Sequence, residues 1–171
     1  METTRDVRHL EELAETLWQE RHLTELLLYK LVCTKLLLAV DEQRYTGLAL
    51  NEVDDVLAVL RTAEHRRDDV VQALAVAWGI SIDELSLSTL VARAPQPWAE
   101  IFEDHRRSFL SLTAEIEAAA SENRRLAASG LHRVQQTMAA LTGGADTGTT
   151  YDPHGQRQPA TARPSLLDKA L

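Results

Sequence analysis

The histidines of this 171-residue chain are the first residues to test for chemistry, because a helical protein can hold a carboxylate di-metal site. Such a site needs Glu-x-x-His motifs that face inward on two helices. Three positions before His22, His65, His105 and His132 stand Gln19, Thr62, Phe102 and Ser129. None of these four is a carboxylate, so the sequence does not predict a di-metal site.

Four side chains, His65, Asp69, His105 and Cys33, are better explained by a structural role than by a chemical one. His65 and Asp69 are four residues apart on a predicted helix, but that side is crowded with charges and is typical of a solvated surface. His105 lies on an apolar stripe, which favours a hydrogen-bonded core or boundary histidine over a catalytic one. Cys33, the single cysteine, lies in a leucine-rich helix and is predicted to be a small buried thiol. With no phosphate loop or nucleophile elbow either, we predict no enzyme, no metal and no cofactor.

Composition indicates helices packed on helices. Leu, Ala, Glu and Arg dominate, whereas aromatic residues make up 5% of the chain. The net charge of −8 repels phosphate backbones, so nucleic-acid binding is not expected. The charged beginning lacks the apolar core of a signal peptide, and no apolar run is long enough to insert in a membrane. We therefore expect a cytoplasmic protein.

The periodicity of apolar residues predicts an all-α fold, an antiparallel bundle of three long helices plus one short helix. The first long helix should span about residues 4–44, with a turn or kink over 41–47, and the second should end at Gly79. Ser81 and Glu84 form a capping-box signature for the short helix, which should end near Ala92. The last helix should begin at Pro97 and end near Thr142. Residues 1–142 would form the bundle domain, and 143–171, rich in Gly and Pro, a disordered tail.

The leucine-rich stretch 17–38 has two apolar sides. Helical geometry at 100° per residue places Leu27, Leu31, Thr34 and Leu38 on one side. It places Leu26, Tyr29, Cys33, Leu37 and Val40 on nearly the opposite one. Such a helix either lies between two neighbours or receives a partner on one side.

Two polar features interrupt this pattern. Asn123 occupies an apolar-stripe position of the last helix, which is typical of a surface or register-setting residue. In the tail, Ser165 and Asp168 could start a helical turn that exposes Leu166, Leu167 and Leu171. A tail segment of this kind folds on a partner in some proteins and is a frayed terminus in others.

Four stretches together resemble the FlgN family of flagellar export chaperones. They are "LWQERHLTELLLYKL", "NEVDDVLAVLRTAE", "PWAEIFEDHRRSFLSLTAEIEAAASENRRLAASGL" and "TYDPHG". The resemblance implies a chaperone that binds the helical terminal segments of the hook-filament junction proteins FlgK and FlgL. It also implies delivery to the export gate, with FlhA as the gate component and Tyr151 as the candidate docking tyrosine.

On this hypothesis the apolar residues that remain after the bundle closes are the candidate partner-binding residues. They are Leu26, Tyr29, Leu37, Leu126, Val134, Met138, Leu141, Tyr151, Leu166 and Leu167. The alternative is a helical coiled-coil adaptor or regulator of another system, in which the same stripes make a homodimer. A metal-dependent bundle enzyme is a third and weaker alternative.

Overall fold

The computed structural model describes residues 2–142, 150–151 and 157–158. The chain divides into two compact units, Met1–Arg124 and Arg125–Leu171, which are described separately below. The described elements are α1 (Glu2–Ala39), α2 (Gln43–Trp78), the 3-10 helix η1 (Ile82–Glu84), α3 (Leu87–Arg93), α4 (Trp98–Thr142), β1 (Thr150–Tyr151) and β2 (Arg157–Gln158). The predicted all-α class, with three long helices and a short one, is confirmed.

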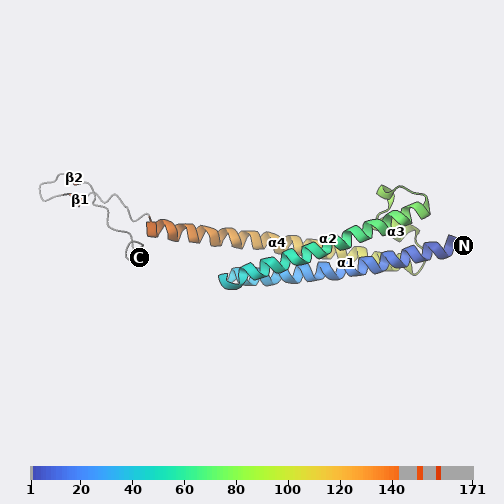
Figure 1. Ribbon diagram of the computed structural model, residues 1–171, viewed down its shortest axis with the longest axis horizontal. Helices are drawn as coiled ribbons and strands as arrows, with labels where there is room; N and C mark the ends of the chain where they lie inside the picture. The colour runs from blue at the N-terminus through green and yellow to red at the C-terminus, as the bar shows by residue number, and fades with distance from the viewer. Residues whose placement is uncertain (1, 143–149, 152–156, 159–171) are drawn as a thin grey trace. The chain divides into compact units, whose positions relative to one another are not determined.

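In the first unit, α1 and α2 run side by side in opposite directions, and the first part of α4 follows the direction of α1 (Figure 1). Two polar contacts tie α4 to α1. Arg21 Nη1 lies 2.8 Å from Asp104 Oδ2, and Asn123 Nδ2 donates to the Leu31 carbonyl at 3.0 Å. Consecutive long helices along the chain are therefore antiparallel (Figure 1), which agrees with the sequence prediction.

The turn between α1 and α2 comes earlier than predicted. α1 ends at Ala39 rather than near Arg44, and α2 already begins at Gln43, so Gly47 lies inside a helix. Asp41 adopts a left-handed conformation, with φ 57°. The Glu42 amide donates to the Leu37 carbonyl at 2.9 Å, which together with Asp41 makes a Schellman-type helix end. Asp tolerates this conformation less readily than Gly, which is why the sequence pointed to Gly47 instead.

The end of α2 and the start of η1 follow the predicted signals. Gly79 has φ 64°, and its amide and that of Ile80 satisfy the last carbonyls of α2. Ser81 and Glu84 form the expected capping box. The predicted helix 81–92 is nevertheless divided into η1 and α3. Ser86 is the N-cap of α3, and its Oγ accepts a hydrogen bond from the Thr89 amide at 3.2 Å.

The core of the first unit has two apolar clusters. The larger one contains side chains from four helices: Leu10, Leu13, Leu17, Val70, Leu74, Leu90 and Phe102. The second cluster is Leu27 of α1 with Val53 and Val56 of α2. Ile116 of α4 packs against this second cluster, so all three long helices contribute to the fold.

The second unit contains the rest of α4 and the two strands. Thr150 pairs with Gln158 and Tyr151 with Arg157 in an antiparallel ladder that sequence analysis did not foresee. Most of the predicted disordered tail lies outside the described residues. The predicted domain boundary after residue 142 stays a prediction.

Candidate partner-binding surfaces

The two apolar sides of α1 have different environments. Leu27 is 6% exposed and Thr34 is buried, so this side of α1 faces the core. The hydroxyl of Thr34 donates to the Lys30 carbonyl at 2.9 Å, which satisfies a polar group inside an apolar interface. Tyr29, on the other side, is 60% exposed. One side of α1 therefore closes the bundle and the other meets solvent.

The exposed side of α1 carries a longer apolar line than the sequence analysis proposed. Trp18, Tyr29 and Val40 follow one another at eleven-residue intervals, and eleven helical residues make three turns plus about 20°. All three are exposed, as is Leu36 on the same side. We name Trp18, Tyr29, Leu36 and Val40 the α1 outer face. Sequence reasoning missed Trp18 and Leu36 because it followed leucines at three- and four-residue spacing.

The other two α1 candidates lie nearer the core. Leu26 is half-buried and packs against the cluster around Leu27, and Leu37 is also half-buried. Cys33, predicted to be buried, is half-buried as well. It lies beside Tyr29, and this contact raises the pKa of the Tyr29 phenol. Among the predicted α1 site residues, Tyr29 is therefore the one with a large accessible surface.

A buried carboxylate lies between α1 and α2. Glu20 is buried, and its Oε2 accepts a hydrogen bond from Arg67 Nη1 at 3.1 Å. Burial raises the pKa of the Glu20 carboxyl, and the positive charge of Arg67 opposes that shift. The other oxygen, Oε1, has no hydrogen-bond partner among the described residues. The pair joins two helices but offers no accessible reactive group.

His105 is a core residue of α4, as predicted. It is buried and stacks on Phe109, with ring centroids 6.3 Å apart. Burial lowers the pKa of its imidazole, the nearby Arg21 lowers it further, and Asp104 acts in the opposite direction. The prediction of a hydrogen-bonded histidine does not hold for Nδ1, which has no partner among the described residues.

Asn123 connects α4 to α1 within the first unit. Its side-chain amide donates to the Leu31 carbonyl, while its Oδ1 is buried without a partner in the described part of the chain. A single hydrogen bond at an otherwise apolar position stabilises one alignment of the two helices over the others. This contact agrees with the register-setting interpretation of Asn123.

In the second unit, the remainder of α4 presents a second apolar line. Leu131, Val134, Met138 and Leu141 recur at three- and four-residue spacing and are 48–60% exposed. We name these four residues the α4 distal stripe. Sequence reasoning found Val134, Met138 and Leu141 but missed Leu131, and Leu126 is half-buried.

The remaining candidate residues lie in the tail. Tyr151 belongs to β1, opposite Arg157 of β2. Leu166 and Leu167 lie outside the described residues.

The described residues contain no group of three or more His, Cys, Asp or Glu side chains placed to hold a metal ion. His65 and Asp69 are both exposed on α2. In the same part of the chain, every helix is too short or too polar to cross a membrane. The accessible apolar features of the described residues are helix surfaces, which are suited to binding another helix.

Comparison with known families agrees with this description. The family model described as "FlgN protein" matches residues 1–159. The chain belongs to the FlgN family. This FlgN match includes every helix and strand of the described residues, and it implies a general role as a flagellar export chaperone. No curated protein and no solved structure matches the chain.

Proposed function

We propose that this FlgN-family protein is a cytoplasmic export chaperone that binds the helical terminal segments of FlgK and FlgL and keeps them unpolymerised. The observation that carries the proposal is the α4 distal stripe, in which four large apolar side chains are 48–60% exposed. An apolar line at this spacing on one helix is the surface that an amphipathic partner helix covers.

The proposed complex is held by apolar contact. Covering a largely exposed leucine or valine with a partner side chain contributes roughly 25 cal/mol per Å² of apolar area removed from water. Ordering the cargo segment opposes this gain. The balance suits a reversible affinity in the micromolar to submicromolar range, about −8 to −10 kcal/mol. Such an affinity protects the cargo segment and still permits its release for export.

Delivery would involve a second partner, the export gate component FlhA. Tyr151 is the candidate contact, because it is the single Phe, Tyr or Trp residue that follows Phe109 in the sequence. A phenol supplies contact area and a hydrogen bond while few torsions are frozen. Tyr151→Ala should then weaken binding to the soluble domain of FlhA and leave binding of the FlgK fragment unchanged.

Co-purification tests the cargo assignment. The full chain is mixed with a terminal helical fragment of FlgK or FlgL, and in parallel with the same cargo lacking that fragment. We expect a stable complex with the terminal fragment and no complex with the cargo that lacks it. The adaptor alternative predicts instead that light scattering finds a homodimer and that neither cargo form is retained.

A further inference from the structure

A groove in the first unit has no role in the proposed cargo binding. Two adjoining hollows of about 590 and 410 Å³ share Leu87 of α3 and Phe109 of α4. The first continues along α4 to Glu117, and the second reaches Leu17 of α1 and Val71 of α2. Because they share two lining residues, we treat them as one groove, with α2 on one side and α4 on the other.

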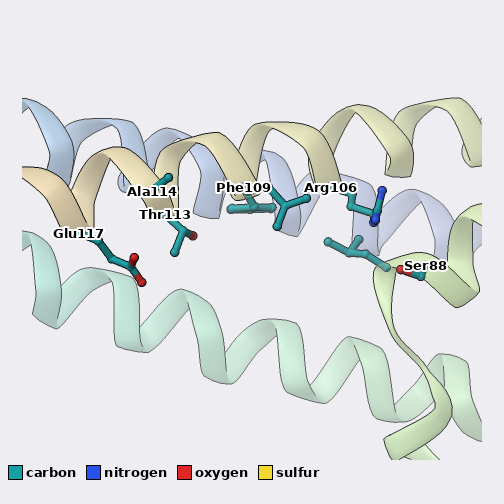
Figure 2. Close-up of a pocket in the computed structure, with 8 residues that line it drawn as sticks. Ser88, Arg106, Phe109, Thr113, Ala114 and Glu117 are labelled. Carbon is teal, nitrogen blue, oxygen red and sulfur yellow. The ribbon is translucent and has the colours of Figure 1, made fainter.

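The α4 wall of the groove consists mainly of small or exposed side chains. Figure 2 shows Thr113 and Glu117 projecting from the side of α4 that faces α2, with Ser88 of α3 at one end. Leu110, on the same wall, is 62% exposed, and Thr113 and Ala114 are small and exposed. Small side chains let a second helix axis approach closely, and the exposed leucine gives that helix an apolar contact.

The length and depth of the groove suit a short helix. The α4 wall is twelve residues long, from Arg106 to Glu117, and its eleven steps of 1.5 Å rise give about 17 Å, or three turns of helix. At the α3 end the groove is deeper, since the side chains of Leu13 and Leu17 at its base are buried core residues. Three long helices with an apolar groove between two of them leave the position that a fourth helix occupies in a four-helix bundle.

The charges along the groove specify the partner. Arg67 pairs with two carboxylates: its Nη1 lies 3.1 Å from Glu20 Oε2 and its Nη2 lies 3.3 Å from Asp68 Oδ1. When both carboxyls are ionised, these three side chains together carry a net charge of −1. Arg106 is held by Glu103 at 3.4 Å. Glu117 has no ion pair within the described part of the chain. The α2 edge, through Asp68, and the α4 edge, through Glu117, are thus both left with negative charge.

We propose that this groove binds an amphipathic helix of another protein, with an apolar stripe of about three turns and Lys or Arg on both flanks. Leucines of the stripe would contact Phe109, Leu110 and Leu87, while the basic flanks would face Asp68 and Glu117. The site uses residues of the first unit and none of the α4 distal stripe. It therefore goes beyond the proposed chaperone function and does not depend on FlgK or FlgL.

Two synthetic peptides test the charge requirement. Both are helical 18-residue peptides with leucines at i, i+3, i+4 and i+7 spacing, and one has Lys on both flanks where the other has Glu. Fluorescence anisotropy with the full chain should give a dissociation constant at least about tenfold lower for the Lys peptide. Equal binding of the two peptides, or no binding of the Lys peptide, would overturn the proposal.

Two matched pairs of variants test the location. Thr113→Trp fills the groove, and Ser111→Trp places the same side chain at another exposed position two residues away, on a different side of α4. Glu117→Lys and Glu115→Lys form the corresponding charge pair. We expect Thr113→Trp to raise the dissociation constant of the Lys peptide by about tenfold or more. Glu117→Lys should raise it by about two- to fivefold, and both control variants should bind the Lys peptide as the wild type does.

All four substituted positions are exposed, so circular dichroism should give the same helicity for every variant. If the groove variants bind the Lys peptide as tightly as their controls, the peptide binds elsewhere and the proposal is wrong.

Discussion

The two parts of α4 have the same apolar periodicity and opposite environments. Up to Arg124, the stripe includes Phe102, which is fully buried, and the buried residues Leu112 and Ala119. After Arg125, the stripe continues through Leu131 and Val134, and these side chains are about half exposed or more. Helical periodicity therefore identifies the apolar side of a helix but does not say what covers it. In the first part the protein's own helices do so, and in the second we propose that cargo does.

The largest expected difference between the two parts is in stability. Phe102→Ala removes a fully buried ring from the larger core cluster and should lower the free energy of unfolding by about 3–5 kcal/mol. Leu131→Ala, on the same helix, should change it by less than about 0.5 kcal/mol. Urea denaturation of the two variants and the wild type measures both values. Similar losses for both variants would mean that the distal stripe is also covered within the protein.

The same contrast applies to the two sides of α1. Leu27→Ala should cost about 2–5 kcal/mol, because the side chain is buried against Val53 and Val56. Tyr29→Ala should cost well under 1 kcal/mol, and Leu37→Ala should fall between them in accordance with its half-buried position. Thermal unfolding followed by circular dichroism ranks the three variants. If Tyr29→Ala destabilised the protein as much as Leu27→Ala, Tyr29 would not belong to an exposed α1 outer face.

A smaller effect should appear as a pH dependence of the buried part of α4. Burial and Arg21 lower the pKa of His105 below its ordinary value of 6.5, so the folded protein binds this proton less tightly than the unfolded chain. The resulting stability is fully present above pH 6.5 and is lost as the pH falls through the folded-state pKa. His105→Gln should remove this part of the pH dependence, whereas His65→Gln, at an exposed position on α2, should leave it unchanged.

Urea denaturation at several pH values below 7.5 measures the effect of His105. Glu20 contributes with the opposite sign, because its pKa is raised above 4.5 and its contribution falls as the pH rises through the folded-state pKa. The difference between wild type and His105→Gln isolates the histidine. If that difference does not change with pH, the histidine is not the origin of the dependence.

The smallest effect should come from the polar contact that joins α4 to α1. Asn123→Leu exchanges one hydrogen bond to the Leu31 carbonyl, and one unsatisfied oxygen, for apolar contact. The free energy of unfolding should change by no more than about 1 kcal/mol in either direction. A loss of several kcal/mol, measured by urea denaturation, would show that the hydrogen bond is essential to the fold.

Much of the fold could be predicted from local chemistry. Gly79 and the Ser81–Glu84 capping box are short-range signals, and both are formed as the sequence indicates. Asp41 was missed because its left-handed conformation is uncommon for a residue with a Cβ atom. The split at Ser86 was missed because a serine is an equally ordinary residue inside a short helix or at its start.

The candidate surfaces were less predictable than the helices. Exposure of Tyr29 and burial of Leu27 depend on where α2 and α4 lie, and this cannot be read from α1 alone. The groove between α2 and α4 likewise arises from Leu87 and Phe109, which are 22 residues apart in the sequence. Periodicity could have found the eleven-residue line from Trp18 to Val40, but not which side of α1 was free.

The most direct test of the central claim is a calorimetric titration of the FlgK terminal fragment into three forms of the protein. They are the wild type, Val134→Asp in the α4 distal stripe, and Ala140→Asp at an exposed position on a different side of the same helix. We predict that Val134→Asp weakens binding by at least about tenfold and that Ala140→Asp binds as the wild type does, with equal helicity in all three. Equal affinity of all three forms for the fragment would contradict the account.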